Sequence, residues 1–342
     1  MKKFLTVWGL LLFISITSYS QEKKYALYSV AFYNLENLFD TIHDAGKNDF
    51  EYLPNGKNKW NSMKYEAKLK NMSEILSQLS TDKLPLGPTI IGMSEVENRR
   101  VLEDLLKQPA LSDRGYEIVH YEGPDRRGVD CAFFYNPKFF HLTASKLAPY
   151  IYENNDTTYK TRGFLIASGT LAGEKVHFIV NHWPSRAAAS PARERAGEQV
   201  RALKDSLLNE DSNAKVIMGD MNDDPMDKSM AVALGAKRKA QDTKEHDLYN
   251  PWWDTLKKGN GTLMYDGKWN LFDQIVFTGN LLGNDRSTLK YYRNEIFRRD
   301  YMFQKEGKYK GYPKRTHAGG VWLNGYSDHL PTIIYLIKEI KD

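Results

Sequence analysis

Cysteine and long apolar segments are scarce in this chain of 342 residues. Cys131 is the one cysteine, which excludes an internal disulfide and a metal cluster built from cysteines. It lies in an apolar run, residues 129–135, so we expect its side chain to be buried. Beyond the first twenty residues, no apolar run reaches the roughly 20 residues that a membrane-spanning helix needs. Repeats and low-complexity linkers are also lacking, which favours a single domain over two.

The chain also lacks a strong excess of positive or of negative side chains. Lysine and arginine number 48 against 43 aspartates and glutamates, which gives a formal charge of +5. Net charge alone therefore indicates no nucleic-acid or membrane partner. Hydrophobic residues make up 41% of the chain and charged residues 27%, a balance that excludes a disordered chain and is typical of a globular protein.

The first twenty residues have the pattern of a signal peptide. Two lysines precede an apolar run over residues 4–14, and Ser18 and Ser20 supply the small residues that a cleavage site requires. We therefore expect residues 1–20 to be removed and residues 21–342 to form one domain. The protein is then expected to be periplasmic or secreted, without stable membrane insertion. An uncleaved N-terminal anchor is the alternative.

Apolar runs bounded by turn residues predict eight β-strands. They cover residues 29–33, 89–93, 129–135, 164–171, 176–181, 215–218, 272–278 and 332–337. Apolar residues at helical spacing predict helices around residues 69–79 and 196–207, and Pro191 suits the first turn of the second. Because nearly continuous apolar strands are buried on both faces, we expect sheets packed on each other and covered by helices.

Polar residues gather at the ends of these strands. They form six segments, residues 33–37, 94–98, 181–186, 219–224, 272–275 and 326–331. Any one of them could be an ordinary turn. Together they supply carboxylates for a hard cation, two histidines, and amides that can hold phosphate oxygens. Mg²⁺ prefers one or two carboxylates completed by water and substrate phosphate, and this set allows that.

The ordered motifs in these segments resemble those of a known superfamily. Asn-x-Glu-Asn, Ser-Glu-Val-Glu, Asn-His-Trp-Pro-Ser-Arg, Gly-Asp-Met-Asn, Asp-Gln-Ile and Ser-Asp-His look like those of the endonuclease/exonuclease/phosphatase superfamily, which includes pancreatic deoxyribonuclease. The resemblance runs over residues 29–335. It implies an α/β fold, a four-layered α/β sandwich with two mixed β-sheets packed face to face and helices outside. The site would lie at one rim.

The resemblance also implies a divalent metal, Mg²⁺ with Mn²⁺ as an alternative. Glu95 matches the glutamate that binds the cation, and Asn34 matches the asparagine beside it. Asp328 matches a carboxylate that completes or supplements the metal site. Glu36 and Glu97, from the same motifs, are expected to be surface or supporting groups.

The catalytic set implied by the resemblance contains five residues. His329 would be a catalytic histidine oriented by Asp273, and His182 would lie on the opposite side of the phosphate. Asp220 and Asn222 would position the attacking water. Physical chemistry supports such a set, since imidazolium donors and a cation neutralise the charge that develops on the phosphate. Either a carboxylate or a histidine could deprotonate the water, so the identity of the base stays open.

Basic residues supply the candidates for substrate binding. Arg127, Arg162 and Arg186 each lie near a predicted strand end, where they could contact phosphate or form structural ion pairs. Residues 290–315 hold nine basic side chains against three acidic ones, with seven aromatics interleaved. This basic aromatic segment could grip a polyanion or form a solvated wall.

The sequence therefore predicts an exported, Mg²⁺-dependent phosphodiesterase, and a nuclease acting on nucleic acid is our first expectation. A phosphomonoesterase or a sphingomyelinase-like phospholipid phosphodiesterase of the same fold is the second. A non-catalytic binding module is the third, and it is disfavoured because all the expected polar positions are filled.

Overall fold

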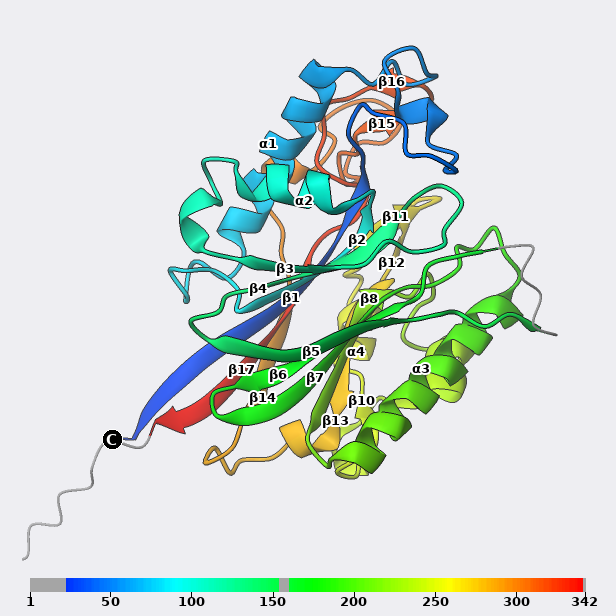
Figure 1. The fold of residues 1–342 in the computed structure, drawn as a ribbon. Helices are drawn as coiled ribbons and strands as arrows, with labels where there is room; N and C mark the ends of the chain where they lie inside the picture. The colour runs from blue at the N-terminus through cyan, green and yellow to red at the C-terminus, as the bar shows by residue number, and fades with distance from the viewer. Residues whose placement is uncertain (1–22, 154–159, 341–342) are drawn as a thin grey trace, which may run out of the picture.

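The computed structural model describes residues 23–153 and 160–340. The predicted signal peptide, residues 1–20, lies outside these residues. Two large β-sheets lie face to face, with helices on the outer side of each (Figure 1). This is the four-layered sandwich of two mixed sheets that the sequence predicts. Within the described residues, no helix combines the length and apolar character needed to cross a membrane.

The first sheet has the strand order β14-β17-β1-β2-β4-β3. Its central strands β1 and β2 run parallel, and the chain's last strand, β17, pairs antiparallel with β1. Helices α1 and α2 cover its outer face (Figure 1). The bounds are β1 Lys24–Leu38, α1 Ser62–Gln78, β2 Ile90–Val96, α2 Arg99–Leu106, β3 Glu117–His120, β4 Asp130–Tyr135, β14 Lys290–Ile296 and β17 Thr332–Ile340.

The second sheet has the strand order β5-β6-β7-β8-β13-β10-β9. Strands β7 and β8 run parallel and are joined through α3, which packs on the outer face of this sheet. The bounds are β5 Phe140–Ala148, β6 Phe164–Leu171, β7 Glu174–His182, α3 Ser190–Glu210, β8 Ala214–Asp220, β9 Ala236–Lys237, β10 Leu248–Tyr249 and β13 Asp273–Thr278.

Shorter elements complete the chain. Two hairpins, β11 Leu263–Tyr265 with β12 Lys268–Asn270 and β15 His317–Ala318 with β16 Val321–Trp322, stand apart from the large sheets. The remaining helices within the described residues are α4 Trp253–Lys257, the π-helix η4 Ser229–Leu234, and short 3-10 turns at Phe50–Tyr52, Ser112–Arg114, Ala240–Asp242, Gly279–Leu281 and Asp300–Met302, the last being η7.

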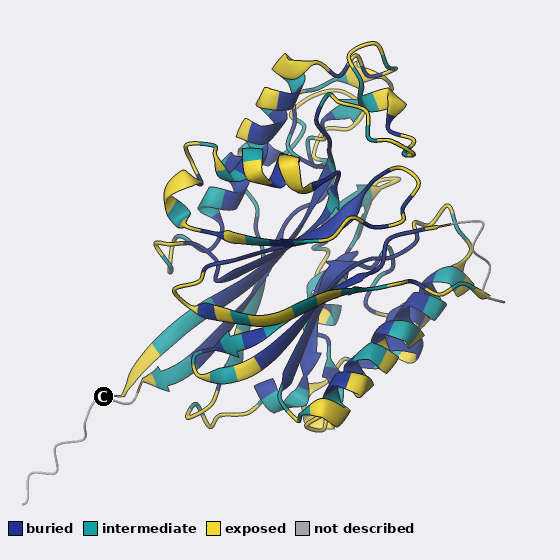
Figure 2. Cartoon of the chain, in the orientation of Figure 1, coloured by how far each residue is buried: buried dark blue, intermediate teal, exposed yellow. Residues whose placement is uncertain are grey.

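Three apolar layers hold the sandwich together. Because side chains alternate along a strand, Val30 and Phe32 of β1 point between the sheets while Ala31 and Tyr33 point toward α1. The strands are accordingly buried, and exposed residues lie on the outer faces of the helices (Figure 2). Cys131 is buried in the layer between the sheets, as expected.

The eight predicted strands and two predicted helices are all present. The apolar runs correspond to β1, β2, β4, β6, β7, β8, β13 and β17, and the helical patterns correspond to α1 and α3, with Pro191 in the first turn of α3. Strands β3, β5 and β14 and helix α2 were not predicted. In β5 and β14 most side chains are exposed or half-buried, so these strands lack a continuous apolar run.

Candidate active site

Three neighbouring strands of the second sheet align the central residues of the site. His182, the last residue of β7, is the register partner of Asp220, the last residue of β8. Asp220 is in turn the register partner of Asp273, the first residue of β13. Side chains in such a row lie about 5 Å apart. The sheet therefore sets one histidine and two carboxylates side by side at its rim.

His329 reaches this row from the loop before β17. Its Nδ1 lies 2.7 Å from Asp273 Oδ2, and its Nε2 lies 3.9 Å from Asp220 Oδ2. Burial by itself lowers the pKa of His329, but the carboxylates of Asp273 and Asp220 outweigh it and hold the pKa well above its ordinary value. His329 is thus an imidazolium whose Nε2 faces the site, and the predicted dyad with Asp273 is present.

Asp220 is the centre of the cluster. Its Oδ1 accepts a hydrogen bond from the backbone N–H of Asn222 at 2.9 Å, and its Oδ2 accepts one from Asn34 Nδ2 at 3.0 Å. The side chain is fully buried, and burial raises the pKa of Asp220 to about 7, with the positive charge of His329 opposing the rise. A carboxylate with a pKa near neutrality suits proton transfer at physiological pH.

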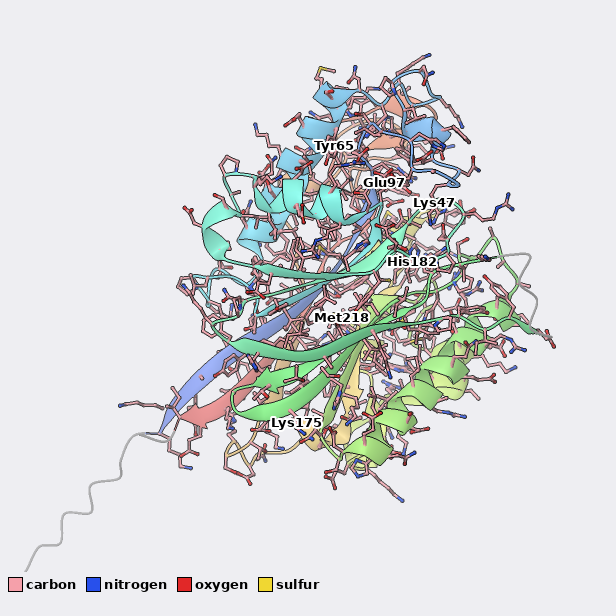
Figure 3. The ribbon with its side chains drawn as sticks, viewed as in Figure 1. Lys47, Tyr65, Glu97, Lys175, His182 and Met218 are labelled. Atoms are coloured by element: carbon pink, nitrogen blue, oxygen red, sulfur yellow. The ribbon has the colours of Figure 1, made fainter. Side chains whose placement is uncertain are left out.

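His182 differs from His329 in its charge. Figure 3 shows it at the opposite end of β7 from Lys175. Its Nε2 lies 3.6 Å from Asp220 Oδ2 and 3.7 Å from Glu95 Oε1. Burial, together with the charges of Arg162 and Arg127, lowers its pKa well below the ordinary histidine value. His182 is therefore neutral, and its buried Nδ1 has no hydrogen-bond partner.

The first sheet brings its own residues to the same rim. Asn34 of β1 pairs in register with Ser94 of β2, and the backbone N–H of Asn37 donates to Glu95 Oε2 at 3.0 Å. Ser327 Oγ donates to the carbonyl of Asn34 at 2.8 Å, which ties the loop before β17 to β1. The segments of Asn34, Glu95 and Asp328 are thus neighbours.

Left-handed backbone conformations mark these strand ends. Glu36, Asn37, Glu95 and Asn222 have φ angles of 47°, 55°, 60° and 51°. Such angles cost energy for residues other than glycine and recur at functional sites. At Glu36, Asn37 and Glu95 they coincide with irregular pairing of β1, β2 and β4, whose register shifts between Asn34 and Leu38 and between Ser94 and Val96. Sequence periodicity carries no signal for them.

The donors at this rim fit a divalent metal. Glu95 and Asp328 supply hard carboxylate oxygens, and Glu95 Oε1 faces His182 and the Asp220 cluster. The carboxamide oxygen of Asn34 accepts the Glu36 N–H at 2.9 Å while its nitrogen holds Asp220. Oxygen donors of this kind are those that Mg²⁺ and Mn²⁺ take. A bound cation would polarise the phosphate and neutralise charge on its oxygens.

Arg315, from the loop before β15, and Glu36 of β1 lie beside Asp328. Arg315 contacts Asp328 Oδ2 at 2.8 Å and Glu36 Oε1 at 3.0 Å. Glu36 is buried, and its second oxygen accepts the Thr316 N–H at 2.6 Å. Burial, with the charge of Asp328, raises the pKa of Glu36 to about 7 against the opposing charges of Lys68 and Arg315.

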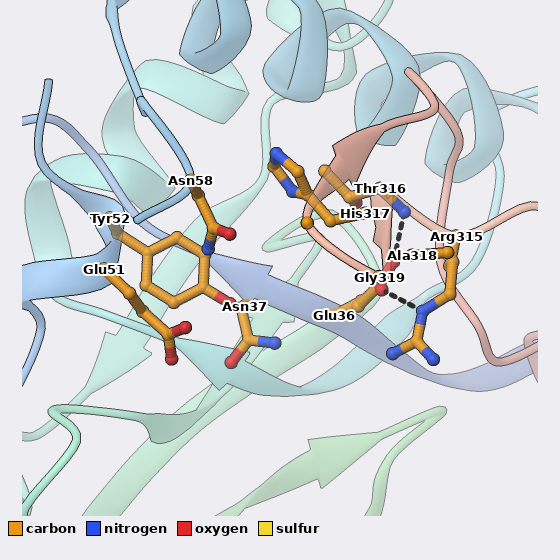
Figure 4. A pocket seen from close by; sticks show the side chains of 11 residues that line it. Glu36, Asn37, Glu51, Tyr52, Asn58, Arg315, Thr316, His317, Ala318 and Gly319 are labelled. Atoms are coloured by element: carbon orange, nitrogen blue, oxygen red, sulfur yellow. Dashed lines mark hydrogen bonds and ion pairs between the residues drawn. The ribbon is translucent and has the colours of Figure 1, made fainter. Parts of the chain in front are cut away.

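Glu36, Arg315 and Thr316 line a pocket of about 240 Å³, and Asn37 and Tyr52 are among the other residues of its lining (Figure 4). Sequence reasoning gave Arg315 no role of its own, because it was one of nine basic residues in its segment. The signal available for Glu36 was its position two residues after Asn34, which places both on one side of an extended strand.

The three predicted phosphate-binding arginines lie near the rim in different settings. Arg162 is buried and contacts Asp125 Oδ2 at 3.1 Å and the carbonyl of Trp183 at 2.9 Å, so it braces the His182 loop. Arg186 donates to the carbonyl of Asn222 at 3.1 Å and pairs with Asp227 at 2.9 Å. Arg127 is half-exposed, with Asp125 Oδ1 at 3.9 Å. All three contact carboxylates of the protein itself.

The basic aromatic segment 290–315 divides into two parts. Its first part forms β14 and the turn after it. There Arg298 stacks on Trp269 at 4.7 Å, and Arg299 stacks on Phe297 at 4.2 Å. Its second part, residues 303–315, forms a loop that ends at Arg315 beside Asp328. The exposed lysines of this loop are Lys305, Lys308 and Lys310.

Comparisons with known proteins identify the family and agree with the fold. The model of the Endonuclease/Exonuclease/phosphatase family matches residues 29–338. The comparison with curated proteins finds no match.

Solved structures share the fold at low identity. D. rerio TDP2 complexed with single strand DNA product is 14% identical, with a TM-score of 0.53 over 91% of this chain and 99% of that one. The mannosyl-6-phosphatase of Bacteroides thetaiotaomicron is 15% identical, with a TM-score of 0.54 over 90% and 99%. ANGEL2, a 2′,3′-cyclic phosphatase, is 11% identical, with a TM-score of 0.57 over 94% and 100%. By the match of its family model over most of its length, the chain belongs to the endonuclease/exonuclease/phosphatase family of metal-dependent hydrolases that act on phosphate ester bonds.

Proposed function

We propose that this protein is an exported nuclease that hydrolyses phosphodiester bonds of nucleic acid with Mg²⁺ or Mn²⁺. The observation that carries the proposal is the arrangement around Asp220. A carboxylate whose pKa lies near 7 stands between a protonated and a neutral histidine. Such a cluster can take a proton from water and donate hydrogen bonds to phosphate oxygens within one site.

Each residue then has a defined task. Asp220, held by Asn34 and by the N–H of Asn222, orients the attacking water and accepts its proton. His329, kept protonated by Asp273, donates from Nε2 to a phosphate oxygen on which charge develops. His182 contacts the phosphate from its other side. Glu95 and Asp328, with Asn34 beside them, would hold the cation.

The surroundings favour a polymeric substrate. The loop over residues 303–315 sets exposed lysines next to the rim, and lysines suit a chain of phosphates. One protein of the same fold was solved with single strand DNA product. A small phosphoester is the second candidate, because the metal carboxylate Asp328 and Arg315 line a recess large enough for one small molecule. A protein of the same fold is a mannosyl-6-phosphatase.

Export is the remaining part of the proposal. It is supported by the two N-terminal lysines, the apolar run over residues 4–14 and the small residues before position 21. The periplasm or the extracellular space would be its place of action. Fractionation of cells, with N-terminal sequencing of the recovered protein, should find a chain that begins at Gln21. Recovery of the intact N-terminus in the cytoplasm would refute export.

A single panel tests the activity. Protein starting at residue 21 is incubated with Mg²⁺ or Mn²⁺ and offered plasmid DNA, RNA, a phosphomonoester and sphingomyelin in parallel. We expect cleavage of nucleic acid, and its loss in Asp220→Asn measured under the same conditions. Release of phosphate from the monoester alone would replace the nuclease by the phosphatase candidate, and sphingomyelin cleavage alone would replace it by a phospholipase.

A further inference from the structure

A second cleft opens beside the active site, between the β11–β12 hairpin and the loop that follows η7. Its volume is about 800 Å³, within the range of small-molecule sites. Its walls are largely aromatic and aliphatic. The hairpin contributes Met264 and Tyr265, the loop contributes Tyr309 and Tyr312, and Leu323 is added from the segment after β16.

The two walls are fastened to each other. The hydroxyl of Tyr312 accepts a hydrogen bond at 2.6 Å from the backbone N–H of Gly267, at the turn of the hairpin. The rings of Tyr309 and Tyr312 meet edge to face, with centroids 5.4 Å apart. Tyr265 is 75% exposed and Tyr309 is 49% exposed, with Lys308 Nζ 5.5 Å from the centroid of the Tyr309 ring. Exposed rings on a fixed frame can stack on a ligand at little entropic cost.

The cleft is continuous with the catalytic rim. Arg315 and Asp328, which meet at 2.8 Å, line the cleft together with the tyrosines. Asp328 also lies 3.9 Å from His329 Nε2. A group attached to a phosphate at this rim would therefore extend between the two walls.

The side chains of the two walls indicate which kind of chemical group the cleft binds. Four polar side chains line the cleft apart from Arg315, Asp328 and the tyrosines, namely Asp266, Gln304, Glu306 and Lys308. A flat aromatic ring needs ring faces and one or two polar contacts at its edge. The exposed rings of Tyr265 and Tyr309 supply the first, and these polar side chains supply the second.

We propose that this cleft is the subsite for the planar base of the nucleotide next to the phosphate that is cleaved, with Tyr265 and Tyr309 as its stacking residues. The inference rests on the proposed nuclease function and goes beyond it by naming what the enzyme recognises. Tyr265 and Tyr309 determine specificity and take no part in the chemistry.

A binding experiment tests the subsite without turnover. In a His329→Ala background with Mg²⁺, adenosine 5′-monophosphate, ribose 5-phosphate and inorganic phosphate are titrated by calorimetry. We expect the base to improve affinity about tenfold, the size of one stacking contact. The pair Tyr265→Leu and Tyr309→Leu should remove this gain and leave the affinity for ribose 5-phosphate unchanged, while the Tyr→Phe pair should retain it.

Tyr25→Leu is the matched control, because Tyr25 is 42% exposed at the start of β1, in no contact with the cleft. Equal affinity for the nucleotide and the sugar phosphate, or equal loss in the control variant, would overturn the inference.

A cleavage experiment separates the subsite from the proposed function. A short oligonucleotide and an abasic oligonucleotide of the same length are offered to the wild-type enzyme. Preference for the first through a lower KM, abolished in the Tyr→Leu pair, supports the subsite. Equal cleavage of both would refute the subsite and leave the nuclease standing, whereas failure to cleave either would refute the nuclease itself.

Discussion

At the scale of single residues, the site depends on keeping one buried histidine protonated, His329, and the other neutral, His182. Both imidazoles lie within 4 Å of Asp220 Oδ2, and burial lowers the pKa of both. His329 gains a second carboxylate at 2.7 Å from Asp273, which reverses the shift. The positive charges of Arg162 and Arg127 lower the pKa of His182 further. Burial lowers the pKa of both rings, and the charges of their immediate neighbours decide the difference between the two.

Replacement of His329 by alanine should lower turnover by at least ~10²-fold, the low end for a positioned acid–base group. The imidazolium that donates to the phosphate would be lost. Turnover of DNA is the measurement, and a far-UV circular dichroism spectrum like that of the wild type is the control for folding. Near-normal turnover would show that the dyad with Asp273 is misassigned.

Asp273→Asn should shift the pH dependence of activity. The carboxylate of Asp273 raises the pKa of His329, so its removal lets His329 lose its proton at a lower pH. If the imidazolium is the active form, the alkaline limb of kcat/KM moves to lower pH, and turnover falls less than in His329→Ala. A pH–rate profile from pH 5 to 10 measures the shift. An alkaline limb that stays in place would assign it to another group.

Metal removal should abolish activity, because Glu95 and Asp328 supply hard oxygen donors. Excess chelator should stop cleavage, and Mg²⁺ or Mn²⁺ should restore it. Glu95→Gln should weaken metal binding when it is titrated by calorimetry in the absence of substrate. Glu103→Gln, on the exposed face of α2, is the matched control. Full turnover in excess chelator would disprove the metal requirement.

At the scale of elements, close approach of strand ends positions the site. Strand β8 ends in Gly219-Asp220 and lies between β7 and β13. A Cβ on Gly219 would lie 2.4 Å from the carbonyl oxygen and 2.6 Å from the Cβ of Asn181. Since no side chain fits, the glycine lets β7 and β8 approach closely enough to set His182 beside Asp220.

Gly219→Ala should therefore destabilise the protein by about 1–3 kcal/mol, the range for overpacking a tight site. The atoms that it would meet belong to Asn181, whose backbone is held in the sheet, so they cannot move aside cheaply. Chemical denaturation measures the change, and the larger side chain of Gly219→Ser should cost more. Wild-type stability in both variants would show that the strands can separate at this point.

At the scale of the whole molecule, two sheets contribute different halves of one site. The first sheet carries Asn34 and Glu95, and the second carries His182, Asp220 and Asp273. The loop before β17 adds Asp328 and His329 between them. Packing of the two sheets is thus required both for stability and for assembly of the site, and the loop over residues 303–315 adds a basic wall.

Salt dependence tests whether that wall contacts a polymer. Each phosphate that a lysine neutralises adds roughly −0.7 to −0.9 to the slope of log affinity against log salt. Replacement of Lys305 and Lys310 by alanine should make the slope for DNA binding shallower by roughly 0.7 to 0.9 per lysine. Arg298 and Arg299 are unsuitable for this test, because they stack on Trp269 and Phe297.

Lys138 and Lys175 supply the matched control pair, since both are exposed and Lys175 lies at the far end of β7 from His182. Cleavage of a small phosphodiester should stay unchanged in both pairs. The same slope in the Lys305/Lys310 variant as in the wild type would make the loop a structural wall and favour a small substrate.

Much of the fold could be read from the sequence because its core strands are apolar on both faces. The runs that became β1, β2, β7, β8 and β17 are unmistakable for that reason. Edge strands such as β5 and β14 bury fewer side chains and leave a weaker pattern. The polar residues at the ends of these apolar runs stand out in the sequence for the same reason, and they indicated where the site would be.

The tertiary structure decided how those residues are connected and charged. Sequence could place Asp273 and His329 in one motif set, but only strand register sets Asp273 beside Asp220, and only burial together with the neighbouring charges fixes the protonation of each ring. Arg315 lies 279 residues from Glu36 in the chain, so no local pattern could join them. Periodicity and turn residues reflect local interactions, which the sequence shows directly. Long-range contacts and desolvation arise only once the two sheets have packed.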